Sequence, residues 1–184
     1  MYIRLIGLIT VFLLIAKIVS ASVTSEKLGT VSFSNSGSDK VQKHFIRGVA
    51  ALHSFWYPEA LAEFEETTKA DPTFAMGYWG QAMTYNHPLW EEQDLKSAKA
   101  ALSKITNTLN ITKREQDYIH AARLLYGEGN KTIRDESYSK AMKSIYSNYP
   151  NDLEAACFYS LSLLGIAKNA ENKLPLQVEA GAIA

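Results

Sequence analysis

The feature that most constrains the fold is an internal helical repeat with a period of about 34 residues. Ala60, Phe64 and Pro72 form the spacing A-x3-F-x7-P, and an aromatic residue, Tyr78, and a small one, Ala82, follow four positions apart. Small residues at fixed repeat positions let two helices cross closely, because a bulky side chain would push the helix axes apart. The repeat therefore predicts an all-α chain of stacked antiparallel helix pairs.

Helix caps and breakers divide the chain into helical segments, and no segment keeps the alternation of a strand. The length of 184 residues and a hydrophobic content of 47% are typical of one globular domain with a sizeable core. Helices are expected at about residues 38–54, 58–71, 73–86, 91–109, 112–127, 133–148 and 152–166. A polar loop and a short terminal helix follow over residues 167–184. This helix is too apolar to cap a repeat array, and it predicts an incomplete array.

The N-terminus has the pattern of a signal peptide over residues 1–21. Arg4 precedes the apolar run LIGLITVFLLIA, and Val19-Ser20-Ala21 suits cleavage after Ala21. The apolar run is shorter than the ~20 residues that cross a bilayer, although an uncleaved anchor is the alternative. We therefore expect a secreted or secretory-lumen protein (periplasmic or extracellular in a bacterium), with no membrane contact after cleavage. Residues 22–37, rich in Ser, Thr and Gly, predict a flexible lead.

Over about residues 41–166 the repeat pattern, with Gly48 at a close-packing position, resembles the tetratricopeptide (TPR) repeat. The segments LGTVSFSNSG, GVAALHSFWY and DPTFAMGYWGQAMTYNHPLW look like a group of exported tetratricopeptide-containing proteins. The resemblance implies a tetratricopeptide-like α-solenoid over residues 38–166. It offers no established activity, and it implies a longer protein with further helix pairs.

In tetratricopeptide arrays the first helix of each pair lines a concave binding groove. The resemblance therefore implies a non-enzymatic scaffold that binds a protein or peptide of unknown identity. By repeat position, the apolar groove would contain Phe45, Val49, Leu52, His53, Met76, Trp79, Met83, His87, Ile119 and Arg123. Trp90 is added because it stands in an insertion, residues 86–90, and insertions in repeats often carry binding function.

A metal-binding or enzymatic protein is the first alternative. His53 and His87 lie 34 residues apart at equivalent repeat positions. A shared ion would need both rings within about 2.1 Å of the metal, whereas neighbouring helices stand about 8–10 Å apart. No cysteine or carboxylate is placed in the sequence to complete a set, and no nucleophile or phosphate-loop motif occurs. We expect no cofactor, metal or catalysis.

A second alternative is a structural fragment whose groove is filled by its own missing C-terminal repeats.

The remaining predictions concern the net charge, the single cysteine and possible glycosylation. With 19 basic and 19 acidic residues the chain is formally neutral, which argues against nucleic-acid binding. Cys157 lies in an apolar helical run and is expected to be buried. Asn110 and Asn130 are possible glycosylation sites in a eukaryotic source.

Overall fold

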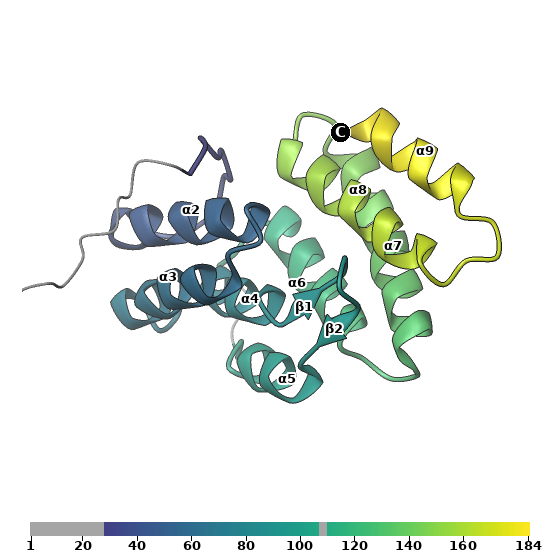
Figure 1. Cartoon of the computed structure of the whole chain (residues 1–184). Coiled ribbons are helices and arrows are strands. Elements are labelled where there is room, and N and C mark those ends of the chain that lie inside the picture. The colour runs from purple at the N-terminus through teal and green to yellow at the C-terminus, as the bar shows by residue number, and fades with distance from the viewer. Residues whose placement is uncertain (1–27, 107–109) are drawn as a thin grey trace, which may run out of the picture.

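The computed structural model describes residues 28–106 and 110–184 (Figure 1). This part of the chain is a mostly helical domain of eight helices, which confirms the predicted helical class. A pair of two-residue antiparallel strands interrupts it, β1 (Asn86–His87) and β2 (Glu92–Gln93). The helices are α2 (Asp39–His53), α3 (Tyr57–Ala70), α4 (Ala75–Met83), α5 (Leu95–Ser103), α6 (Lys113–Leu125), α7 (Lys131–Asn148), α8 (Leu153–Ala167) and α9 (Leu174–Ile183). The predicted signal peptide and residues 22–27 lie outside the described residues.

The helices pack sequentially in two runs, α2–α5 and α6–α9, in which each helix packs on the next one. Helix α4 also contacts α2 and α6 and so joins the two runs. Figure 1 shows β1 and β2 between the runs. None of the described helices is both long enough and apolar enough to span a bilayer.

The helix expected from residue 91 begins at Leu95. Asp94 caps it, because its side chain accepts a hydrogen bond from the Ser97 amide at 3.0 Å. Residues before Asp94 instead form a hairpin in which Asn86 pairs with Gln93 and His87 with Glu92. The insertion predicted at residues 86–90 is therefore the first half of this hairpin.

Small residues let α2 and α4 pack closely on the ring of Phe64 from α3. A Cβ atom on Gly48 would lie 2.8 Å from this ring, and one on Gly80 would lie 2.3 Å from it. Phe64 and Ala82 are fully buried. The repeat pattern predicts close packing at Gly48 and Ala82, and it does not predict it at Gly80.

The expectation of a flexible lead is wrong for residues 28–37. Phe33 is 2% exposed, and its ring centroid lies 5.3 Å from that of Phe45 and 5.1 Å from that of Tyr118. The amide and hydroxyl of Ser36 both donate to Glu115 Oε1 at 2.9 Å. One buried aromatic ring and a buried carboxylate thus anchor a segment whose composition is that of a loop.

The C-terminal helix α9 packs on α8. Tyr159 donates a hydrogen bond to Glu179 at 2.6 Å, and Ser160 donates to the carbonyl of Ala180 at 2.9 Å. Leu174 and Val178 on α9 are more than 60% exposed.

The expectation of a buried Cys157 is wrong. Its side chain is exposed on α8, whereas the adjacent Phe158 carries the buried face of the helix. An apolar run around a helix does not by itself show which side of that helix faces the core.

Candidate functional site

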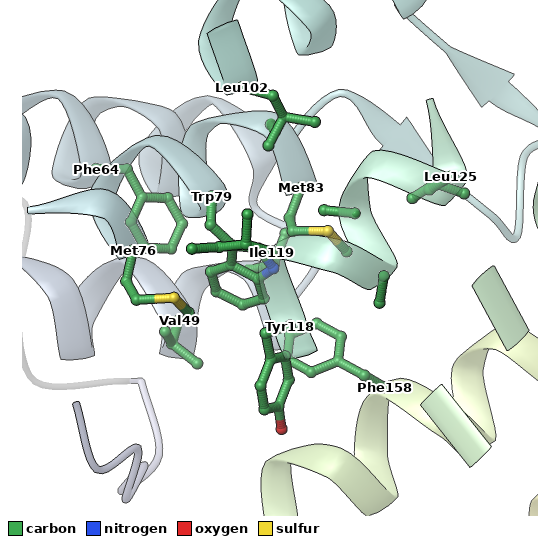
Figure 2. Close-up of a cluster of buried hydrophobic side chains, with 14 of the residues drawn as sticks. Val49, Phe64, Met76, Trp79, Met83, Leu102, Tyr118, Ile119, Leu125 and Phe158 are labelled. Carbon is green, nitrogen blue, oxygen red and sulfur yellow. The ribbon is translucent and has the colours of Figure 1, made fainter. Parts of the chain in front are cut away.

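Seven of the eleven predicted groove residues lie in the hydrophobic core, and two of these, Leu52 and Met83, also line the pocket described below. Their exposed fractions range from 0% to 6%, and Figure 2 shows most of them in one cluster with Phe158. They are Phe45, Val49, Leu52, Met76, Trp79, Met83 and Ile119.

The predicted groove is covered by two segments that the repeat pattern did not link to it. The rings of Phe33, before α2, and Phe158, on α8, each lie 5.6 Å from the ring of Trp79. The groove assignment is therefore corrected, because the face that was expected to bind a partner is filled by this chain's own side chains.

The other four predicted residues are His53, His87, Trp90 and Arg123. Three of them lie near one another: His87 stacks on Tyr57 with ring centroids 3.8 Å apart, Trp90 lies 6.3 Å from the same ring, and His53 lines the pocket that Tyr57 also lines. Arg123 is exposed on α6 and borders a separate shallow hollow. The structure thus brings His53, His87 and Trp90 to one site and leaves Arg123 out of it.

This site is an apolar pocket where the two helix runs meet. Its empty volume is about 550 Å³, including the open mouth. The part of it that a water-sized sphere can enter is about 40 Å³, which is room for a few water molecules and is smaller than typical small-molecule pockets. The apolar wall comes from α2, α4, α6, α8 and the hairpin turn, and it consists of Leu52, Met83, Pro88, Leu125, Phe158 and Leu161.

Polar groups enter the pocket from several helices. His53 at the end of α2 bonds through Nε2 to Glu154 of α8, a residue 101 positions away, and its ring lies 5.0 Å from that of Phe158. Tyr57 and Asp135 line the same pocket. Burial, assisted by the negative charge of Glu92, raises the pKa of Tyr57 to about 12, so its hydroxyl stays protonated at neutral pH.

An aromatic rim, defined here as Phe55, Tyr57 and Trp90, stands beside the pocket. The ring of Trp90 lies 5.6 Å from that of Phe55 and 6.3 Å from that of Tyr57, in edge-to-face geometry. Trp90 is 55% exposed and Phe55 is 36% exposed. Large exposed aromatic side chains that lie together are typical of binding surfaces.

The backbone on both sides of this rim is strained. Phe55 has φ 58° and Glu91 has φ 61°, which is the left-handed region that favours glycine. Phe55 closes α2 in a Schellman motif, because its amide bonds to the Leu52 carbonyl and the next amide bonds to the Ala51 carbonyl. A bulky residue where glycine is preferred is a feature of functional loops.

The histidines have carboxylate partners that sequence spacing did not show. His53 pairs with Glu154, whereas His87 Nδ1 lies 3.0 Å from Glu92 and its Nε2 lies 3.1 Å from the Thr84 carbonyl oxygen. Neither of these His–Glu pairs was predicted from the sequence. Each histidine has a different glutamate, and the described residues contain no group of three metal-ligating side chains.

Both predicted glycosylation sites are exposed. Asn110 precedes α6, and Asn130 caps α7 by accepting a hydrogen bond from the Ile133 amide through Oδ1 at 3.0 Å. The side-chain nitrogen that would carry a glycan is a different atom from this capping oxygen. Glycosylation of Asn130 is therefore compatible with the cap.

Tyr57, Asp135 and Glu154 were not predicted from the sequence as residues of this site. Tyr57 belongs to the run Phe55-Trp56-Tyr57, whose aromatic density was a usable signal. Asp135 and Glu154 have no local signal, because Asp135 reaches the pocket, and Glu154 reaches His53, only through the packing of α7 and α8.

No protein-family model, no curated protein and no solved structure matches this chain. The resemblance to tetratricopeptide proteins therefore stays a prediction from the sequence pattern.

Proposed function

We propose that this protein is a non-enzymatic module that binds a protein or peptide, built from tetratricopeptide-like helix pairs and acting in an exported compartment. The contacts of α4 with α2 and with α6 support the repeat part of this proposal, since these three would be successive first helices. Sequential packing within each run agrees with the alternation of first and second helices.

The observation that carries the proposal is the apolar pocket with the aromatic rim beside it. Binding energy at protein interfaces concentrates in a few aromatic anchors placed next to well-packed pockets. Trp90 and Phe55 are exposed, contact each other and stand on strained loops, and a pocket opens next to them. The proposed site is thus at one end of the originally predicted groove, where Leu52, His53 and Met83 reach the pocket.

The alternative of a structural fragment is favoured by one observation, the exposure of Leu174 and Val178 on α9. Further helix pairs of a longer chain would cover this face. The metal or enzymatic alternative has less support, because His53 and His87 are bonded to separate glutamates.

Selection from a random displayed-peptide library tests the proposed function. The enriched peptides should bind the wild-type protein and lose about 30-fold or more in affinity to Trp90→Ala, the loss typical of an interface hot spot. Trp56→Ala is the matched control, because Trp56 is 52% exposed and is also on the surface near α3. Equal affinity of wild type and Trp90→Ala, or an equal loss in Trp56→Ala, would contradict the proposed site.

A further inference from the structure

The segment of residues 28–37 is attached to the helices in the way that a bound peptide would be. Among the described residues, no backbone–backbone hydrogen bond joins this segment to another part of the chain. Its one buried side chain is that of Phe33. The ring centroid lies 5.3 Å from that of Phe45, 5.6 Å from that of Trp79 and 5.1 Å from that of Tyr118. These three rings, here called the Phe33 socket, come from α2, α4 and α6.

Two adjacent residues of α6, here called the clamp, hold the backbone of the segment. Arg114 Nη1 donates a hydrogen bond to the Ser34 carbonyl at 2.7 Å, and the Ser36 amide donates to Glu115 Oε1 at 2.9 Å. The Ser36 hydroxyl donates to the same carboxylate oxygen at 2.9 Å. In recognised peptides, main-chain hydrogen bonds of this kind give affinity, and sockets for single side chains give specificity.

Both clamp residues are held in place by bonds that do not involve the segment. Arg114 Nε lies 2.5 Å from Oδ2 of Asp152, the N-cap residue of α8. Glu115 is fully buried, and its Oε2 accepts hydrogen bonds from the amide and the hydroxyl of Thr112 at 2.8 Å. Without the segment, Glu115 Oε1 would lose both of its Ser36 donors. The empty clamp would therefore favour another chain that offers an amide and a hydroxyl at this position.

The segment also lies where it can leave without separating the helices. Ser32, Ser34 and Ser36 are exposed. Ser32 and Ser34 border an open hollow, of which a water-sized sphere can enter about 400 Å³, and residues 148–152 form its opposite side. Exposed segments with few buried apolar contacts are the parts of proteins that open locally while the rest stays folded.

We propose that residues 28–37 are a displaceable intramolecular ligand, and that the Phe33 socket and the clamp bind an extended segment of a partner protein. That segment has a phenylalanine followed three residues later by a serine, as Phe33 is followed by Ser36. The inference goes beyond the proposed function, because this site shares no residue with the aromatic rim. While residues 28–37 are docked, they exclude the partner, and its apparent affinity falls with the fraction of molecules whose socket is empty. The segment is thus an autoinhibitory contact.

Native-state hydrogen exchange of the wild-type protein tests whether the segment is released. The Ser36 amide, whose hydrogen bond goes to Glu115, should open with a lower free energy and a smaller urea dependence than the amides of residues 79–82 in α4. Equal opening free energies and equal urea slopes would mean that residues 28–37 leave only when the domain unfolds. That result would overturn the inference.

A peptide added to the protein tests whether the vacated site binds a partner. The probe is LGTVSFSNSG, residues 28–37 with blocked ends, and binding is followed by isothermal titration calorimetry. It should bind the Phe33→Ala protein at least tenfold more tightly than wild type, because the ring attached to the chain no longer fills the socket. Phe33→Leu is a milder variant for the same measurement if Phe33→Ala does not fold. The matched control is Ser32→Ala, which changes an exposed neighbour and should bind the peptide as weakly as wild type.

Changes in the peptide identify the contacts. Phe33→Ala in the peptide removes the ring, and Ser36→Pro removes both donors to the clamp, so each should weaken binding about tenfold or more. Ser32→Ala in the peptide should change it little. Equal affinity of wild type and the socket variants for the peptide would overturn the inference, as would a loss in neither changed peptide. Loss of binding on Trp90→Ala in the protein would move the peptide to the aromatic rim, which would overturn this inference and support the proposed function.

Discussion

Replacing Gly80 by alanine should destabilise the domain, although alanine is the better helix former. In α4 an added Cβ would lie 2.3, 2.4 and 2.6 Å from three carbon atoms of the Phe64 ring. The ring is fully buried and also packs closely on Gly48, whose own added Cβ would be 2.8 Å from it. The ring therefore has little room to move away, and the substitution overpacks the contact between α3 and α4.

The magnitude follows from two opposing effects. Overpacking of a filled core costs about 1–3 kcal/mol, and here the approach is well inside van der Waals contact. Glycine to alanine in a helix interior contributes about 0.8–1 kcal/mol in the opposite direction. For Gly80→Ala we expect a net loss of about 1–2 kcal/mol in the free energy of unfolding, measured by urea denaturation followed by circular dichroism at 222 nm.

Gly181→Ala provides the matched control. Gly181 is in α9, and an added Cβ there would meet no atom within 4 Å. The same substitution should then stabilise the domain by up to about 1 kcal/mol, so that the two variants have opposite signs. In the Gly80→Ala background, Phe64→Leu should be less harmful than in wild type, because a smaller side chain relieves the clash. Equal stability of Gly80→Ala and Gly181→Ala would refute the close packing of α4 on Phe64.

Two further predictions concern the N-terminal segment and the pocket. Phe33→Ala should lower the free energy of unfolding by about 3–5 kcal/mol, as for other buried phenylalanines. The neighbouring Ser32 is exposed, so Ser32→Ala should change this free energy little. A small loss in Phe33→Ala would mean that residues 28–37 do not pack on the domain. Because the pKa of Tyr57 is raised from 10 to about 12, the unfolded chain loses this proton first, and stability should fall as pH rises from 10 to 12. Tyr57→Phe should weaken this fall in urea titrations at stepped pH, and an identical pH dependence of the two proteins would contradict the burial of the hydroxyl.

Local sequence was sufficient for the helices because helix boundaries depend on residues a few positions apart. Thr112 was expected to open a helix, and it caps α6 in a capping box with Glu115. Asp152 likewise caps α8. The repeat also identified Gly48 correctly as a close-packing position, since the spacing of small and aromatic residues is itself a local pattern.

The location of the candidate site was decided by tertiary structure alone. The repeat assigned Trp79 to a binding face, but Phe33 and Phe158 cover it, and they come from segments 46 and 79 positions away in the sequence. Sequence periodicity shows that a helix face is apolar, and it does not show whether a partner or the same chain covers that face.

The pocket depends on the same kind of long-range packing. Tyr57 and Asp135 lie on α3 and α7, and His53 meets Glu154 only because α2 and α8 come together. Caps, helix breakers and apolar spacing in the sequence predicted most of the helices and their order in this chain. Burial of the apolar faces against one another determined which polar side chains reach the pocket, because that depends on contacts between residues far apart in the sequence.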